Sequence, residues 1–406
     1  MPEPLKGGPL EGIRILAIEQ MQSLPYATQL LARLGAEVVK VENTKGGDQG
    51  RGSLPAMLDP EGRSVGATFL RNNLHKQSIC VDLKDPRGRD LVLELAKGFD
   101  VVAENFKAGT ADRLGIGYEQ MRAVKEDLVY LSISGFGSTV ESPYQDWPAF
   151  APIVEAMSGV YELKRMGDQP PLVAPAGALG DIGAAMFAVV GVLAALRQRD
   201  RSGEAQLVDI AMFDAVVAMT DIVMNFWSLG QKGGAAPALI MHGFRSSDGW
   251  FIVQAGREHQ FHALLTTIGH PELIDDPRFA TRQGWVEHLE EVLRPAIEQW
   301  ASQKTKIEAA EALSAAGVAA GPCFTDEEVV VDPHLLARDM VVSIARTDGV
   351  EQPVLTPGNP VRISSWQPHE DGRVPWLGED TEAVLRKELG IDSAAIAQLR
   401  DDGVIA

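Results

Sequence analysis

An aspartate at the start of a long apolar segment has the clearest chemical options in this sequence. Asp181 lies in the run Ala178-Leu179-Gly180-Asp181-Ile182, and residues 182–196 carry only apolar side chains and two glycines. A carboxylate at a helix start can cap the helix, because it accepts a hydrogen bond from an orphan N–H and faces the positive end of the helix dipole. The same carboxylate can instead be a reactive group. The local sequence alone favours the cap.

Basic and polar residues near the ends of expected strands form a second candidate site. The basic ones are Arg51, Arg71, Lys76, Lys84, Lys107 and Arg113. In a parallel sheet, ligands collect outside the carboxyl ends of the strands. Lys84 and Asn105-Phe106-Lys107 directly follow two of these strands, which fits a phosphate-rich ligand. The alternative is that each is a solvated surface charge, as most lysines and arginines are.

The first half of the chain alternates strand and helix patterns, which indicates a parallel sheet with helices on its faces. Strands are expected at residues 12–19, 36–42, 78–83, 100–104 and 128–134, and helices at 26–34 and 86–97. Asp181 follows a loop rich in Pro, Gly and Ala at 169–180. The helix after it is expected to end at Arg197-Gln198-Arg199, with basic residues at the negative end of its dipole.

A flexible break at residues 230–237 (GQKGGAAP) follows a helix expected at 214–227 and opens a second region. That region is expected to hold a strand at 250–254, helices near 258–268, 285–302 and 306–316, and an end at Gly321-Pro322. Helices at 379–389 and 393–399 close the chain. The predicted organisation is a large domain from 1–229, a small domain from 230–330 and a return to the large domain from 331–406.

The composition is that of a globular protein with room for more than one domain, since 45% of 406 residues are hydrophobic and 23% are charged. The first forty residues hold no run of a dozen apolar residues, so we expect a cytoplasmic protein with no membrane partner. A net charge of −19 disfavours nucleic acid as a partner. Cys80 and Cys323 are far apart and form no CxxC, so neither a disulfide framework nor a metal site is expected.

Motifs for common cofactors are missing from the expected loops. The first strand-to-helix turn, Glu19 to Pro25, contains no glycine, so the dinucleotide fingerprint fails there. Residues 135–139 (GFGST) supply two glycines after a strand but no third at the required spacing. No P-loop, HExxH or GxSxG motif occurs. We therefore expect no permanently bound cofactor.

Segments in a fixed order along nearly the whole chain resemble the class III CoA-transferases, a family that includes formyl-CoA transferase and L-carnitine CoA-transferase. The segments are LEGIRILAIE, LLARLGAEVVKVE, GGDQGR, QSICVDLK, DVVAENFKAG, DRLG, GALGDIGAAMFAVVGVLAAL and RSGEAQLVDIAMFDA, with weaker matches at GVAAGPC, DPHLLARDM and LGEDTEAVLRKELG. The resemblance implies an α/β fold with a large Rossmann-like domain, a parallel sheet and a smaller α+β domain. It also implies an interlocked homodimer, in which each chain threads through a ring formed by the other.

The resemblance implies that Asp181 is the nucleophile, because the family uses the Asp of this GD motif to attack the thioester carbonyl of an acyl-CoA. A carboxylate is ionised at neutral pH and needs no base to activate it. The attack would give an aspartyl anhydride and a free CoA thiolate, and the anhydride keeps the acyl group activated for transfer to a second carboxylic acid. Water must be excluded, which the apolar helix suits. Backbone N–H groups from Gly180 to Gly183 are candidates to stabilise the oxyanion.

The family's contacts with coenzyme A fall on residues that follow the expected strands. They are Gln22, Ser23, Val81 through Lys84, Asn105, Phe106, Lys107 and Arg113. Asn43 stands where some members have an arginine that contacts the CoA phosphates, so this contact is either lost or supplied elsewhere, with Lys45 and Arg51 as the candidates.

Two further departures concern the acid substrate. Phe150-Ala151 stands where many members have Tyr-Asp. Gly233-Gly234 is all that matches the long glycine-rich loop of formyl-CoA transferase, and the region around Met241-His242-Gly243 is otherwise different. Neither formate nor oxalate is therefore the expected acid.

Two other functions, a racemase and an inactive binding protein, are alternatives to CoA transfer from an acyl-CoA to a carboxylic acid. An α-methylacyl-CoA racemase of the same fold pairs this Asp with an upstream His as acid and base. None of the eight histidines lies between Leu128 and Asp181, which disfavours the racemase. The intact GD motif disfavours an inactive acyl-CoA binding protein. The identity of the donor and acceptor acids is not set by these residues.

Overall fold

The structure is a computed structural model that describes residues 8–162, 169–174, 176–220, 223–230, 238–364, 366 and 372–406. The chain divides into two compact units, which we call the large unit (Met1–Gly233 with Leu336–Ala406) and the small unit (Gly234–Leu335). The boundaries predicted from the sequence follow residues 229 and 330. The predicted break at 230–237, with Gly233-Gly234 inside it, lies outside the described residues apart from Gly230.

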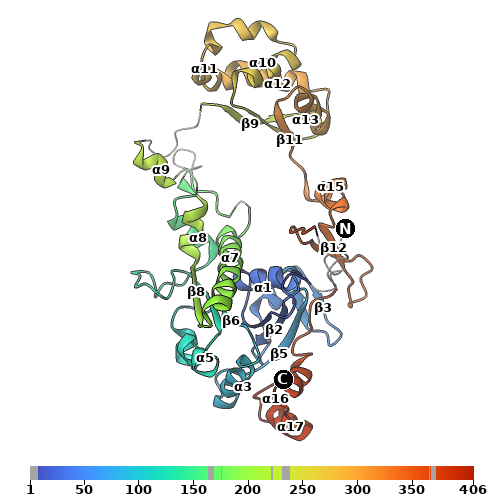
Figure 1. Cartoon of the computed structure of the whole chain (residues 1–406). Coiled ribbons are helices and arrows are strands. Elements are labelled where there is room, and N and C mark those ends of the chain that lie inside the picture. Colours follow the sequence, from blue (N-terminus) through green and yellow to red (C-terminus); the bar gives the residue numbers. More distant parts are fainter. Residues whose placement is uncertain are drawn as a thin grey trace. The chain divides into compact units, whose positions relative to one another are not determined.

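A six-stranded parallel sheet forms the centre of the large unit (Figure 1). Its strands are, in sheet order, β5 (Lys76–Cys80), β2 (Glu37–Glu42), β1 (Arg14–Ile18), β6 (Val101–Glu104), β7 (Val129–Ser134) and β8 (Gln206–Ala211). All neighbouring pairs are parallel. Counted along the chain, the order is 3-2-1-4-5-6, which is that of a Rossmann-like sheet. The predicted α/β fold with a parallel sheet is confirmed, and the strand order switches direction between β1 and β6.

Helices cover both faces of this sheet because its inner strands carry apolar side chains on both sides. One face is covered by α1 (Ser23–Arg33), α7 (Leu179–Ser202) and α8 (Met212–Met219), and the other by α3 (Pro86–Ala96), α5 (Tyr118–Val124), α16 (Thr381–Leu389) and α17 (Ser393–Asp401). In β1, Ile15 and Ala17 belong to the first core, whereas Leu16 and Ile18 belong to the second. This alternation fixes which helix packs on which face.

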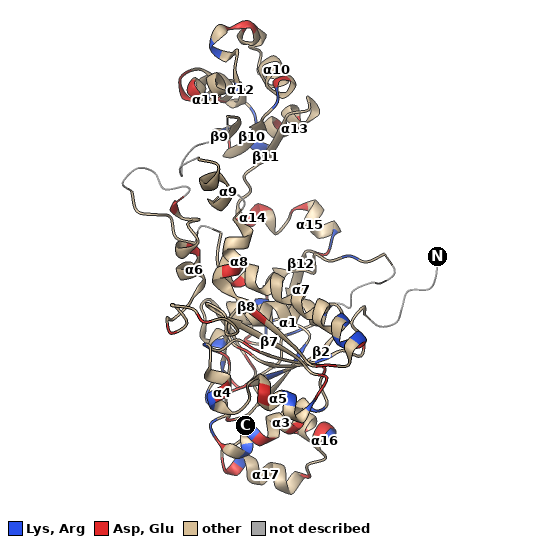
Figure 2. Cartoon of the chain, turned by 60° about the vertical axis from the view of Figure 1, so that its left-hand side comes forward, with Lys and Arg blue, Asp and Glu red and all other residues tan. Residues whose placement is uncertain are grey.

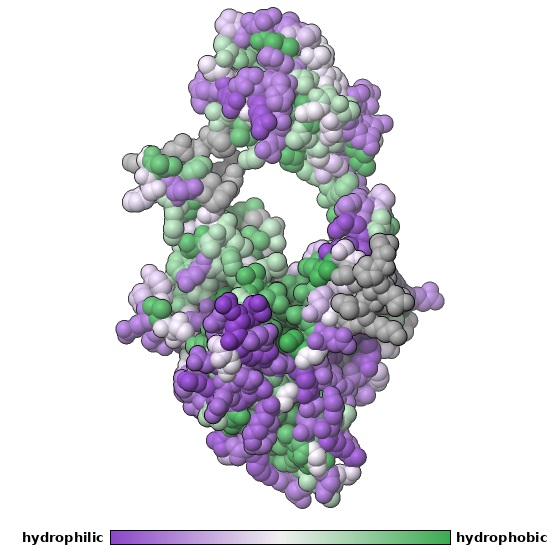
Figure 3. Space-filling model, in the orientation of Figure 1, coloured by the Kyte–Doolittle hydropathy of each residue, from purple (hydrophilic) through white to green (hydrophobic). Residues whose placement is uncertain are grey.

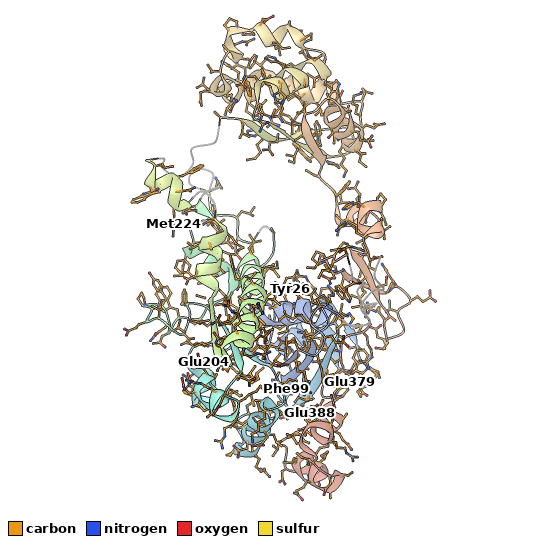
Figure 4. The ribbon with its side chains drawn as sticks, in the orientation of Figure 1. Tyr26, Phe99, Glu204, Met224, Glu379 and Glu388 are labelled. Atoms are coloured by element: carbon orange, nitrogen blue, oxygen red, sulfur yellow. The ribbon has the colours of Figure 1, made fainter. Side chains whose placement is uncertain are left out.

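An ion pair ties the end of the chain to the first strand. Arg14 of β1 lies 2.7 Å from Glu388 of α16, and its guanidinium stands 4.4 Å above the ring of Phe99 (Figure 4). The pair is only partly buried, so the single contact adds little stability. It belongs to a network with Glu37 and Lys387, and such a network stabilises more than one exposed pair. The helices predicted at 379–389 and 393–399 are α16 and α17, and both pack in the large unit.

The remaining elements of the large unit are short. They are a 3₁₀ turn at Gln49–Gly52, the antiparallel pair β3 (Ala56–Leu58) and β4 (Ser64–Gly66), α2 (Ala67–Asn72), α4 (Thr110–Leu114), α6 (Ala151–Met157), α9 (Val223–Ser228), and the antiparallel pair β12 (Val341–Ile344) and β13 (Val354–Pro357).

The single helix predicted at 214–227 is wrong, because α8 ends at Met219 and α9 is a separate helix. Strand β8 and helix α6 were not predicted.

The small unit holds a three-stranded antiparallel sheet, β11 (Ala319–Pro322), β10 (Trp250–Ala255) and β9 (Ile240–Arg245), with helices on one face. The helical segments are α10 (Glu258–Thr267), 3₁₀ turns at Pro271–Asp275 and Pro277–Phe279, α11 (Arg282–Glu287), a π-helical turn at Leu289–Leu293, α12 (Arg294–Ala301), α13 (Lys306–Ala315) and α14 (Asp326–Val329), and α15 (Pro333–Ala337) follows. Burial alternates along β10, and Phe251 and Val253 face the core. Gly321-Pro322, expected to end this region, is instead part of β11.

Helix α7 is unusually long and apolar for a helix on a sheet. In the part of the chain that the structure describes, it is the one helix long and apolar enough by length and composition to cross a membrane, with a mean hydropathy of 2.1. Its charged residues stand at its two ends, with Asp181 in the first turn and arginines in the last (Figure 2). A face that includes Ala184, Ala188 and Val192 is buried against the sheet and α1.

Candidate active site

The first candidate site lies where the strand order switches, at the carboxyl ends of β1 and β6. Asn105 follows β6, and its amide nitrogen donates to the Gln20 carbonyl at 2.9 Å and lies 3.4 Å from Ser23 Oγ. The Gln20 N–H donates back to Asn105 Oδ1 at 3.0 Å. Gln22 precedes α1 as its N-cap residue. The structure therefore brings together the predicted residues Gln22, Ser23 and Asn105.

A cavity of about 180 Å³ opens beside this junction. Its walls are Ile18, Glu19, Gln20, Val41, Glu42, Asn43, Gly47, Asp48, Val81, Asp82, Leu83, Lys84, Phe106 and Leu114. Three predicted site residues, Val81, Lys84 and Phe106, thus share one cavity with apolar walls. A larger cavity of about 570 Å³ lies between α5 and residues 203–205, near the amino end of β8, and none of the predicted residues lines it.

Three predicted cations near this edge of the sheet are exposed. Lys84 lies four residues after the end of β5, and Arg113 donates to Thr110 Oγ1 at 2.8 Å. Lys107 donates to the Asp146 carbonyl at 2.8 Å and lies 3.5 Å from the Asp146 carboxylate. That surface pair is weak, because both side chains are in water. All three charges are available to an anionic ligand.

Arg51 and Lys76, by contrast, are not available, and the prediction that they could bind a ligand's phosphates is wrong. The Arg51 guanidinium donates to both oxygens of Glu42, at 2.8 and 2.6 Å, and stacks 3.7 Å above Phe69. Lys76 is buried 2.6 Å from Glu19, and burial lowers the pKa of its ammonium to about 8. A desolvated and paired charge gains nothing from leaving its partner for an exposed ligand. Arg71 lies 5.2 Å from the ring of Tyr26 on α1 (Figure 4).

The buried ion pairs hold the glycine-free first turn in place. Asp48 accepts a charged hydrogen bond from Lys40 at 2.7 Å, and its other oxygen accepts the N–H of Met21 at 2.8 Å. Met21 has a φ of 63°, a conformation that most residues avoid. Asp48 stabilises the strained turn from outside it, and sequence reasoning missed this residue.

A second loop at the carboxyl edge is held by a carboxylate that sequence reasoning also missed. Asp209 of β8 accepts hydrogen bonds from the backbone and hydroxyl groups of Ser138 and Thr139, at 2.6 to 3.1 Å. Gly137, with a φ of 82°, lets the loop turn there, and a Cβ would stand 3.3 Å from Asp209. Residues 135–139 are thereby fixed at the end of β7.

Asp181 is not the helix cap that its local sequence favours. The N-cap of α7 is Ala178, and Asp181 is the third helical residue. The hydrogen-bond acceptor at the helix start is instead Glu155 of α6, whose Oε1 accepts the Gly180 N–H at 2.9 Å. Within the described residues, no group donates a hydrogen bond to the Asp181 carboxylate.

The surroundings of Asp181 shift its acidity. Burial raises the pKa of the half-buried Asp181 carboxyl to about 6, and the negative charge of Glu155 acts in the same direction. Such a carboxylate is mostly ionised at neutral pH but more basic than an ordinary aspartate. Its ionised form is therefore present at neutral pH, and it is a stronger nucleophile than the carboxylate of an ordinary aspartate.

The position of Asp181 follows from the direction of α7. The helix packs on β7 and β8, ends at Ser202 and leads directly into the amino end of β8. Its first turn therefore lies on the carboxyl side of the sheet, the side that also holds the 180 Å³ cavity. The suggested oxyanion donors near Asp181 are in part already engaged, because the Gly180 N–H binds Glu155 and the Ile182 N–H binds the Ala178 carbonyl. For those two groups the suggestion is wrong.

Comparison with known proteins gives matches along nearly the whole chain. The family described as CoA-transferase family III matches residues 10–381. Acetyl-CoA:oxalate CoA-transferase of Acetobacter aceti is 34% identical over 95% of this chain and 97% of its own length. Succinyl-CoA--D-citramalate CoA-transferase of Chloroflexus aurantiacus is also 34% identical, over 98% of both chains. A solved structure of a CAIB/BAIF family protein from Brucella suis matches with a TM-score of 0.83 and 32% identity, over 94% of this chain and all of that chain.

Proposed function

Because the chain belongs to CoA-transferase family III, and is a CoA-transferase on that ground, we propose that it moves coenzyme A from an acyl-CoA to a carboxylic acid through an anhydride on Asp181. The observation that carries the proposal is the Asp181 carboxylate itself. It is half-buried in the first turn of α7, on the carboxyl side of the sheet. It has no hydrogen-bond donor among the described residues, so its lone pairs are available for attack.

In the proposed cycle Asp181 holds the acid and the coenzyme in turn. One carboxylate oxygen attacks the thioester carbonyl, the C–S bond breaks, and an aspartyl-acyl anhydride and a CoA thiolate result. The thiolate then attacks the aspartyl carbonyl, which releases the first acid and leaves an aspartyl-CoA thioester. The second acid repeats these two steps in reverse and leaves as its CoA thioester. No ATP is needed, because each intermediate stays activated.

The large unit offers complementary surfaces for the coenzyme. The apolar walls of the 180 Å³ cavity, with Phe106 among them, suit a flat ring such as adenine. Lys84, Lys107 and Arg113 are exposed cations that suit its phosphates. Arg51 is committed to Glu42, so Lys45, exposed in the turn after Asn43, is the proposed substitute for the missing arginine.

The proposed active form is a homodimer whose chains interlock. The outer face of α7 exposes Met186 (50%), Phe187 (39%), Val190 (63%) and Leu193 (39%), and Figure 3 shows this area as hydrophobic. An exposed apolar face of this extent marks a contact surface. A second copy of the chain fits it better than lipid, because the opposite face of the same helix is packed into the core.

The acid substrates remain predictions. Relatives with nearly equal identity are named for oxalate, D-citramalate, mesaconate and glutarate. The expectation that neither formate nor oxalate is the natural acid is best tested with purified protein and a panel of acyl-CoA donors and free acids, with products identified by mass spectrometry.

The nucleophile is tested by trapping. Hydroxylamine added during turnover should convert Asp181 to a hydroxamate, located by peptide mass spectrometry, and Asp181→Asn should abolish both the label and CoA exchange. Asp214→Asn is the matched control, because Asp214 is an exposed aspartate in the first turn of α8. Unlabelled Asp181 in an enzyme that is turning over would refute the anhydride. Epimerisation of an α-methylacyl-CoA without CoA exchange would favour the racemase.

A further inference from the structure

Glu155 is a buried carboxylate that the proposed reaction does not use. It is the one charged residue of the short apolar helix α6 and is 0% exposed. A buried carboxylate is costly unless hydrogen bonds compensate its lost hydration. Here both oxygens are engaged, one by the Gly180 N–H and the other by the hydroxyl of Tyr161. That hydroxyl in turn accepts the Ala174 N–H at 3.0 Å.

The contact between Glu155 and the start of α7 depends on a glycine. A Cβ at position 180 would lie 2.9 Å from Val154 Cγ2 and 3.0 Å from Ala151 Cα, too close for any side chain. Gly180 therefore lets the first turn of α7 lie directly against α6. The approach places the Gly180 N–H on the Glu155 carboxylate, one residue before Asp181.

We propose that Glu155 is a positioning residue for the nucleophile, which fixes the first turn of α7 through the Gly180 N–H and keeps a second negative charge beside Asp181. The proposal rests on the proposed role of Asp181. An N–H at this position would otherwise be unpaired, because the first turn of a helix has no internal acceptor for it. Through Tyr161 the same carboxylate also holds Ala174, in the segment that leads to the nucleophile.

The charge environment supports this role. The charged or titratable side chains on the elements packed against α7 are Glu155 on α6, Asp214 on α8, Asp209 on β8, Tyr130 on β7, and Tyr26 and Arg33 on α1. Of these, Glu155 is the group whose charge acts on Asp181, where it adds to burial in raising the pKa. The nucleophile is thereby more basic than burial alone would make it.

Two substitutions separate the two parts of the role. Glu155→Gln keeps the size and an oxygen that accepts the Gly180 N–H, but it removes the charge. We expect the acid limb of kcat/KM against pH to move to lower pH by up to about one unit, because burial remains the larger cause of the shift. Glu155→Ala removes the hydrogen bond as well, and we expect kcat to fall by about ten- to a hundredfold with KM for acyl-CoA changed less than about threefold.

The controls make the outcome decisive. Asp214→Asn removes a charge from the neighbouring helix α8 and should leave the pH profile in place. If Glu155→Ala does not fold by circular dichroism, the Glu155→Gln pH profile still decides whether the Glu155 charge acts on the nucleophile. The charge part of the role is refuted if the Glu155→Gln acid limb coincides with that of the wild type, and the hydrogen-bond part is refuted if folded Glu155→Ala keeps the wild-type kcat. Full activity of Asp181→Asn would instead overturn the proposed function, so the two failures are distinguishable.

Discussion

Replacing Arg51 with alanine should destabilise the protein while leaving its affinity for coenzyme A unchanged. The Arg51 guanidinium makes two hydrogen bonds to Glu42, and both side chains are almost fully buried. Removing one member of a buried ion pair leaves the other unpaired and costs roughly 3–5 kcal/mol. The large unit has about 300 residues, so its unfolding entropy is about 0.6 kcal/mol/K. The expected fall in Tm is therefore roughly 5–8 °C.

The loss should depend on pH in a defined direction. Burial alone would raise the pKa of Glu42, but Arg51, together with Lys40 and Ser78, outweighs burial and holds the pKa at about 2. A carboxyl group with a lowered folded-state pKa contributes stability above its unfolded-state pKa, and this stability is lost as pH falls. The gap in free energy of unfolding between wild type and Arg51→Ala should be full at pH 7 and shrink between about pH 4.5 and 2.

The assay pairs thermal unfolding, and denaturant unfolding as a function of pH, with isothermal titration of CoA. Lys45→Ala is the matched control, because Lys45 is exposed in the turn after β2. It should weaken CoA binding and leave Tm unchanged, the reverse of Arg51→Ala. The reasoning fails if Arg51→Ala weakens CoA binding by tenfold or more at an unchanged Tm, since Arg51 would then contact the ligand.

Three more predictions concern the site and the assembly. Phe106→Ala removes an apolar wall of the 180 Å³ cavity and should weaken CoA binding by about tenfold, or 1.4 kcal/mol, by calorimetry; an unchanged affinity would place the ring elsewhere. Single-turnover formation of the Asp181 adduct should decline as pH falls through about 6, because the carboxyl protonates there; a midpoint near pH 4 in rapid-quench experiments would contradict the burial argument. Val190→Glu puts a charge on the exposed apolar face of α7 and should yield monomers in sedimentation velocity, whereas dimers at wild-type affinity would show that this face is not the interface.

The strands that the sequence predicts well are those that are rich in apolar residues and buried. β1, β2, β6 and β7 are buried along nearly their whole length, so composition alone marks them. β8 is half-exposed at the edge of the sheet and mixes Gln and Asp with its apolar residues, so its pattern is weak. The small-unit strand β9 contains Gly243, and β11 contains Gly321 and Pro322, residue types that are depleted in strands.

Site residues could be predicted from the sequence where their position follows from the end of a strand. They could not be predicted where their availability depends on an ion pair with a residue far along the chain. Residues after strands, such as Lys84 and Asn105, fall at one edge by topology alone. Whether a cation is free or buried depends on a partner far along the chain, as with Lys76 and Glu19. Glu155 lies 25 residues from Gly180 in sequence, and its one local signal was a lone acid in an apolar helix.

The glycine-free first turn bears on which nucleotides the large unit can bind. Nicotinamide and flavin dinucleotides bind sheets of this order by laying their pyrophosphate against bare glycine backbone in that turn. Here Met21 takes the left-handed conformation with its side chain in place, and Asp48 holds it there. Met21, a residue with a side chain, thus stands in the turn where dinucleotide-binding proteins present bare backbone, so we expect NAD to leave Tm unchanged where CoA raises it. The side chain at this one turn would then separate the protein's ligand from the dinucleotides that sheets of this order commonly bind.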